Sequence, residues 1–135
     1  AKRALEIAGG YVEEREAFGQ KLIERESVQI LLGEAARNIH AGRLLVMNAA
    51  WKLDQGDFAR KEVSMAKVAV ADTLHQAVDT AIQLCGAKGY SKDTLLEWMY
   101  RYARQARLVD GASEVHKAVL ARFFKDEGLD FWQWG

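Results

Sequence analysis

The chain has 135 residues, half of them hydrophobic and 28% charged, which is the size and composition of one globular domain. Nineteen Lys and Arg residues balance nineteen Asp and Glu residues, so a diffuse electrostatic attraction to nucleic acid or to an anionic membrane is not expected. The apolar runs are only a few residues long, far short of the roughly 20 that span a bilayer. We therefore expect a single soluble domain with no transmembrane segment and no export leader.

The composition predicts an all-α fold, because the chain has no proline and is rich in residues that favour helices. A first helix is predicted from the start to about Glu16, ending near Phe18 and Gly19 and followed by a loop. Its apolar face comprises Leu5, Ala8 and Val12. The chain opens with helical composition and without a capping residue, so it is expected to be cut from a longer protein.

Two long helices are predicted next, over residues 27–54 and about 59–84, joined by the turn signal at 54–57 and therefore antiparallel. Two glycines inside the first of these, Gly33 and Gly42, predict a close approach of helices. The apolar stripes of the two helices predict a core that includes Leu32, Ile39, Val46, Val70, Leu74 and Ala81.

The glycine-containing segment 86–89 interrupts the helical pattern. A short helix is predicted over about 93–105, and another begins at Asp110 or Gly111 and runs to about Lys125. The fold predicted is an up-and-down four-helix bundle with one additional short helix, formed by residues 1–126. Residues 127–135 form an aromatic tail, which packs either on a partner chain or across the domain's own core.

Metal and nucleotide sites of familiar types are not expected. Di-iron bundles carry paired Glu-x-x-His motifs, and no Glu stands three residues before His40, His75 or His116. Each histidine is expected as a surface or hydrogen-bonded structural residue. The lone Cys85 excludes an internal disulfide and a cysteine zinc cluster, and is expected as a small buried hydrophobe. No G-x-G-x-x-G, P-loop or G-x-S-x-G motif occurs.

Three segments at helix ends carry groups that could bind a ligand, and each also has a plain structural interpretation. Arg15 and Phe18 could hold a phosphate and stack a flat ring, or could simply end a helix. The segment from Gln83 to Tyr90 could let a ligand approach the backbone, or could be a glycine C-cap. Asp110 could present a carboxylate to a ligand or serve as a helix N-cap.

Taken in order, these segments resemble the C-terminal helical domain of the acyl-CoA dehydrogenases. Residues 15–19 match the family's R-x-x-F-G, residues 62–67 its A-S-M-A-K region, and residues 83–90 its Q-x-x-G-G-x-G-Y. Residues 97–104 parallel E-R-x-x-R-D-A-R, and residues 110–114 fall where most members carry E-G-T-S-E or E-G-T-S-Q. The resemblance covers the chain from Ala1 to about Phe124.

The chain departs from these motifs at four positions. Asp110 stands for the usual catalytic Glu, Ala112 for Thr, Ala87 for the second Gly, and Tyr102 for Asp. The Asp-Gly pair followed by an acid-Val-His segment is most like the branch that contains acyl-CoA dehydrogenase family member 11. Some family members take their base from an earlier helix, so the role of Asp110 stays open at this point.

The resemblance implies an FAD enzyme that oxidises an acyl-CoA thioester to the 2,3-enoyl-CoA. It implies Asp110 as the base and Gly111 against the thioester end of the substrate. The residues implied to border the FAD are Ala112, Ser113 and Glu114. The residues implied to reach the FAD of a neighbouring subunit are Arg15, Phe18, Gln83, Gly86 and Ala87.

The same resemblance implies the partners. They are an acyl-CoA substrate, an electron-transfer flavoprotein or similar acceptor, and further copies of the chain in a homo-dimer or homo-tetramer. It implies a cytoplasmic location in a bacterium, or the mitochondrial matrix or peroxisome in a eukaryote.

The family's N-terminal helical and central β domains are missing, so the isolated chain is expected to be inactive. The alternatives are a non-catalytic oligomerisation or scaffold bundle and, disfavoured by its missing motifs, a ferritin-like metal protein.

Overall fold

A computed structural model describes residues 1–133 of the chain. The main helices are α1 (Lys2–Glu14), α2 (Glu26–Asp54), α3 (Arg60–Cys85), α5 (Leu96–Gln105) and α6 (Ser113–Glu127). The shorter elements are the strands β1 (Glu16–Ala17) and β2 (Gln20–Lys21), the 3-10 helix η1 (Leu22–Glu24), the single turn α4 (Ala87–Tyr90) and the 3-10 helix η2 (Gly128–Trp132).

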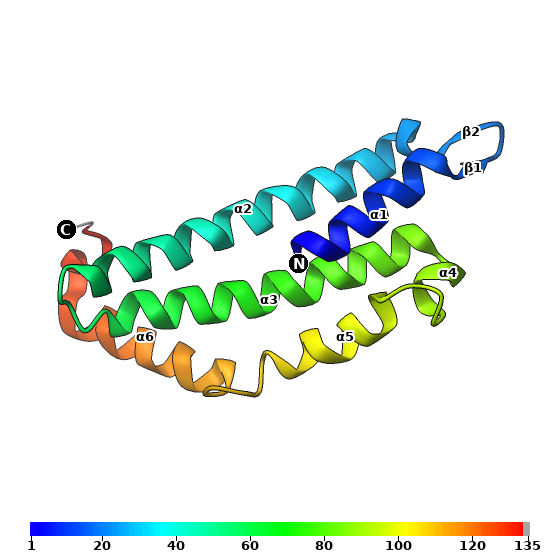
Figure 1. The fold of residues 1–135 in the computed structure, drawn as a ribbon. Coiled ribbons are helices and arrows are strands. Elements are labelled where there is room, and N and C mark those ends of the chain that lie inside the picture. The colour runs from blue at the N-terminus through cyan, green and yellow to red at the C-terminus, as the bar shows by residue number, and fades with distance from the viewer. Residues whose placement is uncertain (134–135) are drawn as a thin grey trace.

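Helix α3 is the central element, since α1, α2, α4, α5 and α6 all pack against it. Helices α2 and α3 lie side by side and antiparallel over their whole length, and α1 lies along one half of them (Figure 1). Helices α5 and α6 follow each other end to end along α3, so that together they take the place of a fourth long helix (Figure 1). The predicted all-α up-and-down bundle is confirmed.

Small residues bring α2 and α3 close together. The buried positions of α2 are Val28, Ala35, Gly42 and Ala49, which recur every seven residues and so lie on one face. A Cβ on Gly42 would lie 3.4 Å from Cγ2 of Val70, so Gly42 serves the predicted close approach. The same prediction is wrong for Gly33, which is exposed, since an added Cβ there would have no atom of another helix within 4 Å.

The core lies at the end of the bundle that α1 covers, and includes Ala4, Ala8, Val12, Val78, Ala81 and Leu96. Of the predicted core residues, Ala81 is fully buried, whereas Val46 and Val70 are 48% and 37% exposed in this chain. The reason is that α1 is much shorter than α2. At 1.5 Å per residue, the 13 residues of α1 span roughly 20 Å and the 29 of α2 roughly 44 Å. The far half of the α2–α3 face is therefore left uncovered by α1.

Three local predictions need correction. Residues 16–21, predicted as the end of the first helix and the loop that follows it, form an antiparallel hairpin in which Glu16 pairs with Lys21 and Ala17 with Gln20. The predicted break at 86–89 contains the helical turn α4, which starts directly after Gly86 at φ 57°. The last long helix begins at Ser113, because Asp110 and Gly111 have left-handed φ values of 55° and 88° that cannot continue a right-handed helix.

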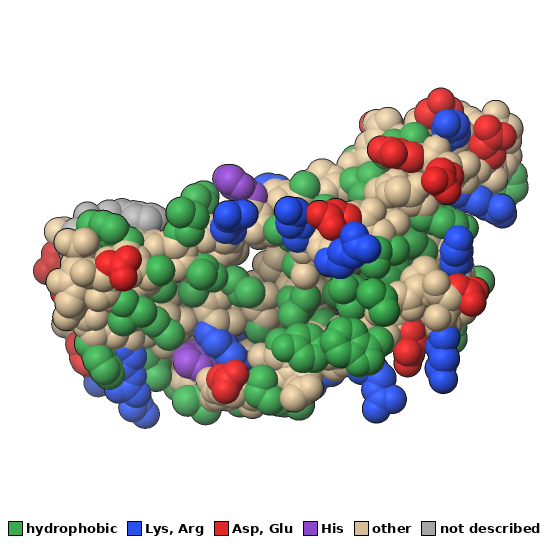
Figure 2. All heavy atoms as spheres, viewed as in Figure 1, with side chains coloured by type: hydrophobic (Ala, Val, Ile, Leu, Met, Phe, Trp, Pro, Cys, Tyr) green, Lys and Arg blue, Asp and Glu red, His purple; other side chains and the backbone are tan. Residues whose placement is uncertain are grey.

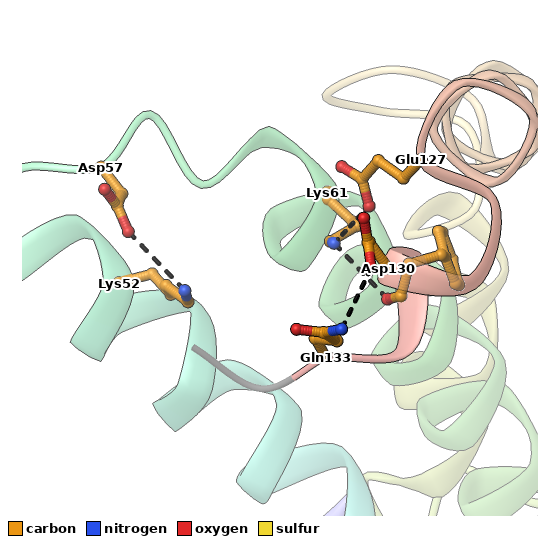
Figure 3. Close-up of polar contacts among 7 residues, drawn as sticks. Lys52, Asp57, Lys61, Glu127, Asp130 and Gln133 are labelled. Carbon is orange, nitrogen blue, oxygen red and sulfur yellow. Dashed lines mark hydrogen bonds and ion pairs between the residues drawn. The ribbon is translucent and has the colours of Figure 1, made fainter.

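The aromatic tail packs on its own domain as far as the structure describes it. Phe131 is buried and meets the ring of Phe124 edge to face at 5.5 Å between centroids. Lys61 of α3 donates to Glu127 and to the carbonyl oxygen of Phe131, which ties the tail to the start of α3 (Figure 3). Residues 134–135 of the predicted tail lie outside the described residues.

Candidate functional site

The loop between α5 and α6 presents Asp110 at the surface of the bundle. The backbone N–H of Ser113 donates to the carbonyl oxygen of Arg107 at 3.1 Å, which closes residues 107–113 into a tight turn. Asp110 and Gly111 occupy its tip in the left-handed conformation, which glycine adopts freely and aspartate tolerates better than most residues. The N-cap of α6 is Ala112, so Asp110 is not the cap and its carboxylate is left for another use.

Asp110 lies at the edge of a largely apolar pocket of about 360 Å³ between α2, α3 and α5. Val46, Val70 and Val109 contribute apolar surface, and the charged residues in its lining are Asp110 and Lys67. Hydrophobic side chains lie in several groups on the face shown in Figure 2, among polar and charged ones. A carboxylate beside such a pocket could act on a group at the end of an apolar chain.

Three buried polar atoms at this turn and beside it lack a hydrogen-bond partner among residues 1–133. They are Nζ of Lys67, Nε of Arg107 and Oγ of Ser113. Buried polar groups are normally paired, so these three are exceptions gathered in one part of the described chain. Ser113 itself is fully buried, and of the three residues implied to border FAD only Ala112 and Glu114 reach the surface.

The hairpin after α1 displays an aromatic ring to solvent. Phe18 and Gly19 form its two-residue turn with φ values of 54° and 82°, and a bulky residue rarely adopts a positive φ. Phe18 is 97% exposed, and its ring lies 5.5 Å from the guanidinium carbon of Arg25. Arg25 also donates to the carbonyl oxygen of Ala17 at 2.6 Å. The hairpin is thus braced with the ring and the exposed Arg15 facing outward.

The end of α3 and the start of α4 lie at the same end of the bundle as the hairpin (Figure 1). Gln83, Gly86 and Ala87 are all exposed. Gly86 ends α3 with φ 57°, as the plain C-cap interpretation predicted. Nine residues separate Leu74, at the edge of the Asp110 pocket, from Gln83, which is roughly 14 Å along the helix. The predicted site residues therefore fall into two groups on separate parts of the surface.

Sequence reasoning missed the contacts that hold Asp110 in place. His116 of α6 lies within hydrogen-bond distance of Ser64 of α3 and of the carbonyl oxygen of Asp110. Ser64 and Lys67 lie in the matched 62–67 motif and His116 follows the 110–114 motif, and these positions were the available signal.

Among the described residues, no three His, Cys, Asp or Glu side chains gather as metal ligands. None of the described helices is both long and apolar enough to cross a membrane.

The family model described as "Acyl-CoA dehydrogenase, C-terminal domain" matches residues 1–124. The chain belongs to this family. The chain is 41% identical over 125 residues to acyl-CoA dehydrogenase family member 11 of Gallus gallus, a match that covers 91% of this chain and 16% of that protein. It is 37% identical over 121 residues to 3-(aryl)acrylate reductase of Clostridium sporogenes, covering 90% of this chain and 32% of the relative.

Among solved structures, the FAD complex of PigA superposes with a TM-score of 0.88 at 25% identity, covering 94% of this chain and 33% of that one. This acyl-CoA dehydrogenase C-terminal domain thus spans about a sixth to a third of the length of the relatives it matches. The similarity extends over both groups of predicted site residues, because the family match runs from residue 1 to residue 124.

Proposed function

We propose that the protein containing this domain is an FAD-dependent dehydrogenase that oxidises an acyl-CoA thioester to the 2,3-enoyl-CoA. The observation that carries the proposal is the position of Asp110. This residue is exposed, is not the N-cap of α6, and is among the residues that line an apolar pocket in a domain of this family. This arrangement suits a base that acts beside the acyl chain of a thioester.

In the proposed reaction, the carboxylate of Asp110 takes the proton from the α-carbon. The α C–H bond breaks, an O–H bond forms on Asp110, and the electron pair becomes the α,β double bond as the β-hydrogen leaves as hydride. FAD, when bound, supplies the acceptor for that hydride. Gly111 has no side chain and so leaves room for the thioester end of the substrate beside Asp110.

The second group of residues fits a contact with FAD at a neighbouring subunit. Arg15, Phe18, Gln83, Gly86 and Ala87 are all exposed at one end of the bundle. Phe18 keeps a ring in solvent at an unfavourable backbone angle, which is the kind of strain that functional sites store. An exposed guanidinium can pair with a phosphate and an aromatic ring can stack on a flat one.

The further partners proposed are an acyl-CoA substrate, an electron-transfer flavoprotein or similar acceptor, and other copies of the chain in a dimer or tetramer. Large apolar side chains on the outer face of α2 support the oligomer, since Leu44, Met47 and Trp51 are each more than half exposed. The domain alone is proposed to be inactive because it carries only one side of the site.

A second candidate is the reverse reaction, reduction of an enoyl thioester or acrylate. It is favoured by the 37% identity to the Clostridium sporogenes reductase. The same residue would serve, because a carboxylic acid at Asp110 could return a proton to the α-carbon. The non-catalytic scaffold is the remaining alternative, and it predicts that Asp110 has no role in turnover.

The test uses the full-length protein with bound flavin, mixed without oxygen with acyl-CoA thioesters of different length while flavin absorbance is followed. Asp110→Asn should abolish flavin reduction and leave folding and flavin content nearly unchanged, because an amide cannot accept the proton. Asp110→Glu should retain activity. Asp79→Asn, a change at an exposed aspartate of α3, is the matched control. Fast flavin reduction by Asp110→Asn would show that Asp110 is not the base.

A further inference from the structure

We propose that His116, supported by Ser64, is a positioning residue that holds Asp110 in its reactive place. The inference rests on the proposed function, since it assigns His116 a task only if Asp110 is the base. His116 is the fourth residue of α6 and lies six residues after Asp110. It is not the base itself, because both of its ring nitrogens are already engaged within the domain.

The two contacts of His116 select one tautomer of the neutral ring. The Nε2 atom lies 3.2 Å from the carbonyl oxygen of Asp110, and a carbonyl oxygen can only accept, so Nε2 carries the hydrogen. In the neutral ring Nδ1 is then an acceptor, and it lies 3.1 Å from Oγ of Ser64, whose hydroxyl can donate. Ser64 is 2% exposed on α3. The imidazole therefore connects the central helix of the bundle to the peptide of Asp110.

The same ring also packs against Gly111. A Cβ added to Gly111 would lie 2.8 Å from Nε2 of His116, so the imidazole edge lies directly against the backbone of this residue. Asp110 and Gly111 are the two left-handed residues of the turn. A left-handed backbone at Asp110 is unfavourable for a residue with a Cβ and persists only where its surroundings enforce it. His116 supplies that constraint through a hydrogen bond and a steric contact.

A second attachment to α3 lies on the other side of the turn. Nε of Arg107 is 3.4 Å from Oδ1 of Asp72. Helices α3 and α6 are antiparallel (Figure 1). Ser64 near the start of α3 therefore meets His116 of α6, and Asp72, further along α3, meets Arg107, which precedes α6 in the chain. The turn with Asp110 thus contacts α3 on both sides, through the hydrogen bonds of His116 and through this ion pair, in which Nε of Arg107 makes no hydrogen bond. The Arg107 pair is about one-third exposed on each side, whereas His116 contacts the peptide of Asp110 itself.

The consequence for the reaction depends on the length of the Asp110 side chain. An aspartate side chain is one methylene shorter than the glutamate that most of the family carries at this position, so it has less freedom to compensate for a displaced backbone. A misplacement of about 1 Å can cost roughly a hundredfold in rate. Loss of the His116 contacts should therefore slow proton abstraction much more than it weakens substrate or flavin binding, to which residues outside this turn also contribute.

The experiment compares four variants of the full-length protein with bound flavin. His116→Ala removes both contacts. His116→Gln keeps an amide N–H that can donate to the carbonyl of Asp110, and Ser64→Ala removes the second partner of the ring. The matched control is His40→Ala, a change at an exposed histidine of α2. The readouts are flavin reduction by acyl-CoA, the apparent substrate Kd from the same traces, and hydrogen exchange of the amides of residues 107–113 without substrate.

We expect His116→Ala to reduce the rate of flavin reduction by about tenfold to a hundredfold with little change in substrate Kd. Amides of residues 107–113 should exchange faster in this variant. His116→Gln should recover most of the rate, Ser64→Ala should show a smaller loss than His116→Ala, and His40→Ala should match the parent protein in every readout.

Unchanged flavin reduction and amide exchange in His116→Ala would overturn the inference. Should that variant fail to fold, an unchanged rate and exchange in Ser64→Ala, or no rate in a folded His116→Gln, would overturn it instead. Failure of the proposed function looks different. In that case Asp110→Asn itself remains active, and the exchange of residues 107–113 still reports whether His116 holds the turn.

Discussion

The Nζ atom of Lys61 at the start of α3 lies 2.6 Å from Oε2 of Glu127 at the end of α6. Both side chains are mostly buried, being 15% and 30% exposed. The same ammonium lies 5.2 Å from the ring centroid of Phe131. One cation therefore connects the first turn of the central helix, the last turn of α6 and the aromatic tail (Figure 3).

Glu127→Gln should lower the free energy of unfolding by about 1 to 3 kcal/mol, because it leaves a largely buried ammonium without its charged partner. Urea denaturation followed by circular dichroism measures the loss. The matched control is Asp57→Asn, which breaks the 3.7 Å pair of Lys52 with the more exposed Asp57 and should cost less than about 1 kcal/mol. Equal losses for the two changes would contradict the structural role assigned to Lys61.

Two glycines should respond to alanine in opposite directions. A Cβ on Gly89 would lie 2.8 Å from Cβ of Cys85 and 2.9 Å from the carbonyl oxygen of Ile82, so Gly89→Ala should cost about 1 to 3 kcal/mol through overpacking. Gly33 lies inside α2 with open space around it, so Gly33→Ala should stabilise the protein by up to about 1 kcal/mol. Thermal denaturation of both variants beside the parent checks the prediction, which a rise in Tm for Gly89→Ala would contradict.

Cys85 should make stability depend on pH in the alkaline range. Burial raises the pKa of its thiol above the ordinary value of 9.0, partly offset by the nearby ammonium of Lys88. Well below pH 9.0 the thiol is neutral in both the folded and the unfolded chain, so its contribution to stability is fully present. As the pH rises further, the unfolded chain loses the proton first, and this favours unfolding.

The measurement for Cys85 is the free energy of unfolding of the parent and of Cys85→Ala, from neutral pH to about pH 10. The cavity left by alanine should make the variant less stable at neutral pH. The difference between the two proteins should narrow above pH 9.0, since only the parent has the thiol. A difference that stays constant over this range would show that the thiol does not titrate differently on folding.

Phe18 is expected to lower the thermal stability of the protein and to strengthen its binding of FAD. Phe18→Gly relieves the left-handed backbone at φ 54°, which favours the folded hairpin by about 1 kcal/mol, less the weak attraction of the ring to Arg25. The full-length variant should have a Tm equal to or above that of the parent without flavin and a weaker affinity for FAD, measured by calorimetry on the apoprotein. Phe58→Ala, at another highly exposed phenylalanine, is the control and should leave flavin affinity unchanged.

The long helices could be predicted from local sequence. Apolar residues at helical spacing and a turn signal at 54–57 placed α2 within one residue at its start and at its end, and α3 within one residue at each end. The motifs at 15–19, 83–90 and 110–114 likewise identified the family and the residues of the candidate site. These features are readable because helix propensity, apolar spacing and motif matches depend on residues a few positions apart.

Features that depend on distant residues were decided by the tertiary structure. Periodicity alone placed Val46 and Val70 in the core, but their burial depends on how far α1 reaches along α2 and α3. Aspartate is a common N-cap residue, so the sequence left Asp110 as a possible N-cap. Only the left-handed turn and the start of α6 at Ser113 excluded that role. His116 and Ser64 lie 52 positions apart in the chain. Their contact exists because α6 packs antiparallel on α3, and no local pattern encodes which residues of two packed helices will meet.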